Sequence, residues 1–78
     1  PETKIQVDIA EKSHVTIIVF NLVGQKVATL ANSSMDVGKY TLTWGGLNDN
    51  GTPIPSGVYF YEMSTSSYHS IKKLVLVK

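Results

Sequence analysis

Apolar and polar residues alternate along most of this chain, beginning with its first ten residues. In residues 4–10 every second position is apolar, and these positions are Ile5, Val7 and Ile9. A period of two is typical of a β-strand that has one face in a core and the other in water. Residues 15–20 read VTIIVF, a β-branched run that is apolar on both faces and too short to favour a helix. Both segments are therefore predicted to be strands, the second of them central in its sheet.

Four further strands are predicted, and turn-forming residues separate them. They are expected at residues 26–30, 39–44, 58–64 and 71–77. Gly24 lies where a tight turn requires a positive φ angle, which predicts a hairpin around it. Ser33 and Ser34 fall in a predicted loop, and residues 65–70 form a predicted polar turn. Residues 45–57 hold the densest concentration of Gly, Asn, Asp and Pro, which predicts a long connecting loop.

Six or seven short strands at this spacing predict an all-β fold, an immunoglobulin-like antiparallel β-sandwich of about seven short strands. The alternation predicts inward-facing side chains at Val15, Ile17, Val19, Tyr59, Tyr61 and Met63. Tyr40 and Trp44 share one face of their strand and are likewise expected in the core. Because 78 residues suffice for one core, residues 1–78 are predicted to form a single module.

Composition and charge exclude several classes of function. The chain has no cysteine and no arginine, and its lysines and acidic residues leave a formal net charge of +1. Such a small and scattered charge does not form the basic patch that nucleic-acid binding requires, and arginine, the usual residue for contacts with nucleic acid, is absent. No apolar run approaches the ~20 residues that a membrane-spanning helix requires, so no membrane insertion is expected.

No set of residues has the spacing of a catalytic or metal site. His14 and His69 lie far apart and have no cysteine partner, so both are predicted to be surface residues. Asp8 and Glu62 fall on the wet faces of their strands, and nothing marks them as an acid–base pair. Residues 48–51, Asn-Asp-Asn-Gly, lack the ligand frame and the final glutamate of a calcium loop, which predicts a turn. We therefore expect no catalytic residue, no metal and no cofactor.

An ordered set of short motifs covers almost the whole chain. It comprises VTIIVFNLVGQKVATL at residues 15–30, Gly38-Lys39-Tyr40, Trp44, Asn48-Asp49-Asn50-Gly51 and Ser56-Gly57-Val58-Tyr59-Phe60-Tyr61. In this order the motifs closely resemble the type IX secretion C-terminal sorting domain, a bacterial family related to the Ig-like domain of the flagellar hook-capping protein. The resemblance implies a non-catalytic secretion-sorting and cell-surface anchoring domain, the C-terminal module of a longer exported protein.

The same resemblance implies partners, a location and candidate recognition residues. The implied partners are an outer-membrane translocon or sortase and the cargo domain of the parent chain. The implied location is the cell surface or the extracellular space, after passage through the periplasm. The positions that recur in the family are Gly38, Tyr40, Gly57, Tyr59, Lys72, Lys73 and Lys78. A folded strand edge or hairpin can offer main-chain hydrogen bonds to such partners without any reactive group.

Two other functions fit the pattern. The aromatic residues of a sandwich can stack on sugars, which favours a carbohydrate-binding or adhesion module. Ile18 and Phe20 lie on the predicted outer face of their strand, and Tyr68 lies in a predicted turn, so these three form a candidate interface. An exposed interface of this kind favours a structural or fibre-assembly Ig-like domain and leaves self-association open.

Overall fold

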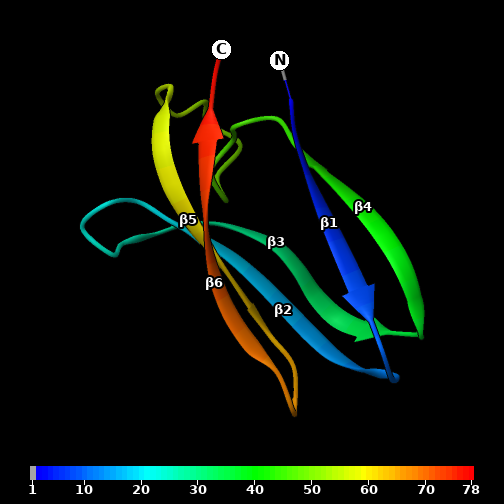
Figure 1. Cartoon of the computed structure of the whole chain (residues 1–78). Helices are drawn as coiled ribbons and strands as arrows, with labels where there is room; N and C mark the ends of the chain where they lie inside the picture. The colour runs from blue at the N-terminus through cyan, green and yellow to red at the C-terminus, as the bar shows by residue number, and fades with distance from the viewer. Residues whose placement is uncertain (1) are drawn as a thin grey trace.

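The computed structural model describes residues 2–78, and these residues fold into two packed β-sheets (Figure 1). Within this range there are six strands: β1 (Thr3–Ile9), β2 (Ser13–Phe20), β3 (Lys26–Met35), β4 (Gly38–Trp44), β5 (Gly57–Ser64) and β6 (His69–Leu76). One sheet has the strand order β1-β4 and the other the order β3-β2-β5-β6, and every pairing is antiparallel. The predicted all-β antiparallel sandwich is confirmed.

Residues 2–78 form six strands, one at each of the six predicted segments and one fewer than the approximate count of seven. The long segment between β4 and β5 contributes turns and one isolated bridge, between Leu47 and Pro53. Proline lacks the N–H that a continuous ladder needs, and glycine favours conformations that strands reject, so this segment cannot extend as a seventh strand. The prediction of a connecting loop at residues 45–57 is confirmed except at Gly57, which begins β5.

Alternate residues of the strands build a single core between the sheets. The buried apolar residues are Ile5, Val7, Ile9, Val15, Ile17, Val19, Ala28, Trp44, Tyr59, Met63, Leu74 and Leu76. All the side chains predicted to face inward lie in this core or, like Tyr40 and Tyr61, pack against it. Burying one large aliphatic side chain contributes about 1.5–3 kcal/mol to the free energy of unfolding. These twelve buried residues are therefore the main source of stability in a chain without disulfides.

The third strand is longer than the sequence pattern predicted. β3 continues to Met35, and Ser33 and Ser34, expected in a loop, pair with Val15 and His14 of β2. These small polar residues satisfy the backbone groups of β2 while their own side chains stay exposed at the sheet edge. β6 similarly begins at His69, inside the predicted turn.

The remaining turns follow local hydrogen bonding. At the β2–β3 hairpin Gly24 has φ +85°, and its N–H donates to the carbonyl oxygen of Asn21 at 3.0 Å. The Asn21 side-chain oxygen accepts two further backbone N–H groups, from Val23 and Gln25.

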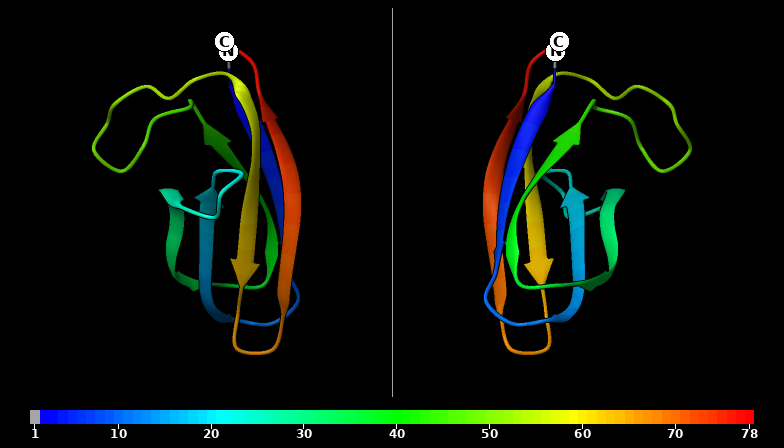
Figure 2. Two further views of the ribbon diagram at one scale, coloured as in Figure 1. Left: turned by 90° about the vertical axis from the view of Figure 1, so that its left-hand side faces the viewer. Right: turned by 90° about the vertical axis from the view of Figure 1, so that its right-hand side faces the viewer.

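The two additional views show the start of β1 and the end of β6 at the same end of the molecule (Figure 2). No helix in residues 2–78 is long and apolar enough to cross a membrane.

Candidate interaction surfaces

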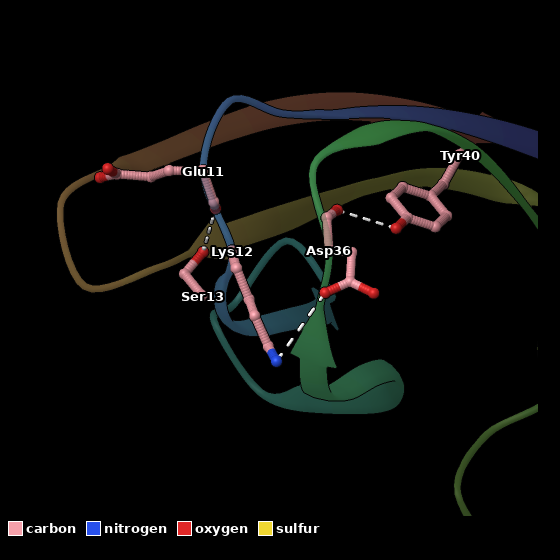
Figure 3. Close-up of polar contacts among 5 residues, drawn as sticks. All are labelled: Glu11, Lys12, Ser13, Asp36 and Tyr40. Atoms are coloured by element: carbon pink, nitrogen blue, oxygen red, sulfur yellow. Dashed lines mark hydrogen bonds and ion pairs between the residues drawn. The ribbon is translucent and has the colours of Figure 1, made fainter.

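The first Gly-x-Tyr motif anchors the connection between the two sheets. The hydroxyl of Tyr40 donates a hydrogen bond to the carbonyl oxygen of Asp36 at 2.8 Å (Figure 3). Gly38 lies between them with φ +156°, and a Cβ added there would meet the Tyr40 ring only at an ordinary van der Waals distance of 3.7 Å. Lys12 approaches the Asp36 carboxylate at 3.9 Å, but both side chains are largely exposed, so this ion pair contributes little.

The second Gly-x-Tyr motif repeats this geometry at the start of β5. The hydroxyl of Tyr59 donates to the carbonyl oxygen of Pro55 at 2.6 Å, and Gly57 lies between them with φ +157°. The Tyr59 ring is buried and meets the Trp44 ring edge to face, with centroids 5.9 Å apart. The Trp44 indole N–H in turn donates to the carbonyl oxygen of Leu47 at 2.9 Å. Four of the candidate recognition residues therefore hold loops in place.

The three candidate lysines lie in three different surroundings. Neighbours in a strand point to opposite faces, so Lys72 lies in the inward-facing row of β6 and Lys73 on the outer face, opposite Phe60. The backbone N–H of Lys78 donates to the Ser56 hydroxyl at 3.0 Å, and its ammonium group donates to the Gly46 carbonyl at 3.4 Å. The structure does not bring these lysines together as one positive patch.

The outer face of the four-stranded sheet carries an apolar surface that we call the outer-face patch. Its members come from β2, β5 and β6, and they are Ile18, Phe20, Val58, Phe60, Ile71 and Val75. Phe20 and Phe60 are directly opposite each other across β2 and β5. Ile71 is 60% exposed and Val75 51% exposed, so the patch is open to solvent on its β6 side. Ile18 and Phe20 are thus on the outer face, as predicted.

The candidate interface predicted from the sequence did not include the other four members of this patch. Apolar residues at the outward positions of the two last strands were the signal, because a sheet face in water normally carries polar residues there. Two charged residues interrupt the patch: Glu62 lies opposite Ile71, and Lys73 lies opposite Phe60. Glu62 also contacts His69 at the edge of the sheet.

The Asn-Asp-Asn-Gly cluster forms the predicted turn. The Asn48 side-chain oxygen accepts N–H groups from Asn50 and Thr52 at 3.0 and 2.9 Å. Asp49 has a role that the sequence did not reveal, since its carboxylate accepts the Thr29 backbone N–H at 2.7 Å. Its own N–H donates to the carbonyl oxygen of Val27 at 3.2 Å. Asp49 therefore pairs with the free edge of β3 as a strand would.

Titratable side chains are dispersed over residues 2–78. No group of three or more His, Cys, Asp or Glu residues in this range could hold a metal ion. His14 and His69 are exposed, as predicted, and bond to Asn32 and Glu62 respectively. Tyr68 is 54% exposed beside the β5–β6 turn, also as predicted.

Two antiparallel sheets around one core, with tyrosines bonded back to the chain ahead of their strands, define an immunoglobulin-like domain. The FlgD Ig-like domain family matches residues 1–68, so the chain belongs to that family. A solved structure of FlgD from P. aeruginosa superposes with a TM-score of 0.75 and 22% sequence identity. That match spans 97% of this chain and 61% of the FlgD chain, and it confirms the immunoglobulin-like fold. No curated protein matches the sequence.

Proposed function

We propose that this chain is a non-catalytic assembly module whose outer-face patch packs against a second copy of the same domain. The observation that carries the proposal is a group of six apolar residues, interrupted only by Glu62 and Lys73, on a sheet face that would otherwise be polar. Contiguous exposed apolar surface on a small domain marks an interaction site. Membership of the FlgD Ig-like domain family supports a structural role of this kind.

The charges within the outer-face patch suit contact between identical copies. In a two-fold contact the same surface of both copies meets. If one residue of the first copy contacts a second residue of its neighbour, the reverse contact is made as well. Glu62 and Lys73 lie diagonally across β5 and β6, on either side of the line from Phe60 to Ile71. A second copy turned about a two-fold axis can therefore place each carboxylate opposite a lysine while the apolar side chains meet between them.

Sedimentation velocity over two decades of concentration tests this proposal. The unaltered domain is expected to associate as concentration rises, and the double variant Ile71→Thr and Val75→Thr to associate about tenfold more weakly. Threonine keeps the β-branching that suits a strand, so the fold is retained. Val37→Thr is the matched control, because Val37 is 65% exposed but lies between β3 and β4, away from the patch. An unaltered domain that stays monomeric throughout the range would refute self-assembly.

A second candidate function is secretion sorting, favoured by the motifs that resemble the type IX sorting domain. Under this proposal the folded module is exported to the cell surface or beyond, and a translocon or sortase recognises it. Lys72 and Lys73 are exposed on the last strand, and Tyr68 is exposed at the turn before it, where a receptor can reach them. Fusing the module to a reporter in a host with the type IX machinery tests the proposal. Export of the fusion supports it, and retention of the folded fusion in the periplasm counts against it.

A further inference from the structure

The two sheets differ in width, and this leaves one side of the sandwich open. At the usual strand spacing, four strands are roughly 19 Å wide and two strands roughly 10 Å. β1 and β4 therefore cannot cover the whole inner face of the sheet β3-β2-β5-β6. Between β1 and the β5–β6 hairpin the structure has a groove of about 480 Å³.

The groove is lined on one side by the edge of β1 and on the other by side chains of β5, β6 and the turn between them. One wall is the edge of β1, residue by residue from Gln6 onward. Tyr61 and Met63 of β5 form an apolar floor, and Tyr68 stands at the turn. The inward-facing row of β6 is buried at its end, at Leu74 and Leu76, but it begins with the polar Ser70 and Lys72, which face the groove. The core thus stops short of this region.

The wall formed by β1 is a free strand edge. β1 pairs with β4 on one side only, and no other backbone hydrogen bond within residues 2–78 involves it. In an antiparallel pair, alternate residues direct both N–H and C=O away from the partner strand. A row of such unpaired groups is a template for another strand. The chemistry that it can recognise is therefore an extended backbone.

The opposite side of the molecule, at the outer edge of β3, is closed in a way that this side is not. There the edge of β3 is also free of a partner strand, but Asp49 supplies both a donor to Val27 and an acceptor to Thr29. Among the described residues no loop donates or accepts a backbone hydrogen bond at the edge of β1; the Ser67 hydroxyl donates a long hydrogen bond to the Glu11 carboxylate, at 3.4 Å, beyond the end of β1.

We propose that this groove binds an extended peptide segment of a partner protein, which pairs with the free edge of β1 as a third strand of that sheet. The segment places apolar side chains over Tyr61 and Met63, and polar side chains alternate with them toward solvent. Lys72 favours an acidic side chain on the β6 side of the groove, whereas Asp8 and Glu11 favour a basic one on the β1 side. The groove lies on the inner side of the wide sheet, so binding here is independent of contact through the outer-face patch.

A tethered strand tests the proposal without knowledge of the natural partner. A seven-residue alternating Val–Thr peptide is joined to Lys78 by a Gly-Ser linker of about 15 residues, whose average span of roughly 21 Å lets the peptide reach along β1. Tethering gives an effective concentration in the millimolar range, so weak pairing is detected. The matched control carries proline at alternate peptide positions, because proline cannot donate to a strand.

Hydrogen exchange measured by NMR is the readout. The outward-directed amides of β1 are expected to exchange at least about tenfold more slowly in the Val–Thr protein than in the proline control. Equal rates in the two proteins would overturn the proposal, and so would protection confined to β6, since that would place the added strand on the other sheet. Amides of Ile17 and Val19 in the core report that both proteins are folded.

Discussion

The hydroxyl of Tyr59 donates a hydrogen bond to the carbonyl oxygen of Pro55, four residues earlier and 2.6 Å away. Tyr40 and Asp36 have the same relationship at 2.8 Å, with glycine midway in both cases. The two motifs each hold the chain where it enters a strand after a loop. They differ in burial, since Tyr59 lies in the core beside Trp44 while Tyr40 is half-buried.

Removing the Tyr59 hydroxyl should therefore cost more stability than removing that of Tyr40. We expect Tyr59→Phe to lower the free energy of unfolding by about 1–2 kcal/mol, because it leaves a partly buried carbonyl without its donor, and Tyr40→Phe by about 0.5–1 kcal/mol. Urea unfolding followed by tryptophan fluorescence measures both. Tyr68→Phe, at an exposed turn position, is the control and should change little. The reverse order of the two costs would contradict this assignment.

Gly46 and Gly51 form a pair that separates backbone strain from crowding. Their φ angles are +77° and +79°, so alanine is strained by a similar amount at both, about 1–2 kcal/mol. An added Cβ at Gly46 would lie 2.9 Å from side-chain carbons of both Leu76 and Lys78, whereas at Gly51 it would meet nothing within 4 Å. Overpacking adds about 1–3 kcal/mol, so Gly46→Ala should be the more destabilising by that difference in thermal or urea unfolding. Equal costs would show that the Leu76 and Lys78 side chains move aside freely.

The sequence predicted the strands and their inward rows because both depend on a local period of two. Val15, Ile17 and Val19 could be assigned to the core from their neighbours alone. Pairing between distant segments has no such local signal. Ser33 and Ser34 are small and polar, as in a loop, and they are strand residues only because β2 lies beside them.

The candidate surfaces were predictable to different degrees for the same reason. Outward alternation indicated Ile18 and Phe20, but their combination with Phe60 into one patch depends on the β2–β5 pairing. The groove depends on how four strands face two, which is a property of the whole fold. The hydrogen bond from the Thr29 backbone N–H to the Asp49 carboxylate likewise joins residues 20 positions apart. A turn motif in the sequence carries no information about that partner.

Asp49→Ala should expose the edge of β3 without unfolding the domain. The carboxylate accepts from the backbone N–H of Thr29 at 2.7 Å and, at 3.4 Å, from its hydroxyl. Losing these bonds at an exposed site should cost about 1 kcal/mol. The Thr29 amide should also exchange with solvent at least tenfold faster, because it loses its acceptor. Asn50→Ala is the control, since only the backbone N–H of Asn50 bonds within its turn. Unchanged protection at Thr29 would show that the loop does not cap β3 in solution.

Ile17 and Ile18 are adjacent, are the same residue type and lie on opposite faces of β2, so they test the register of the sandwich directly. Ile17 is fully buried, with 0% exposure, whereas Ile18 lies on the outer face opposite Glu62. Ile17→Ala should lower the free energy of unfolding by about 2–5 kcal/mol, since it leaves a cavity in the core. Ile18→Ala removes the same atoms from a half-buried surface position and should cost about 1 kcal/mol or less. Because a one-residue slip exchanges the two faces of a strand, equal costs or the opposite order would contradict the β2 register, and with it both the core and the outer-face patch.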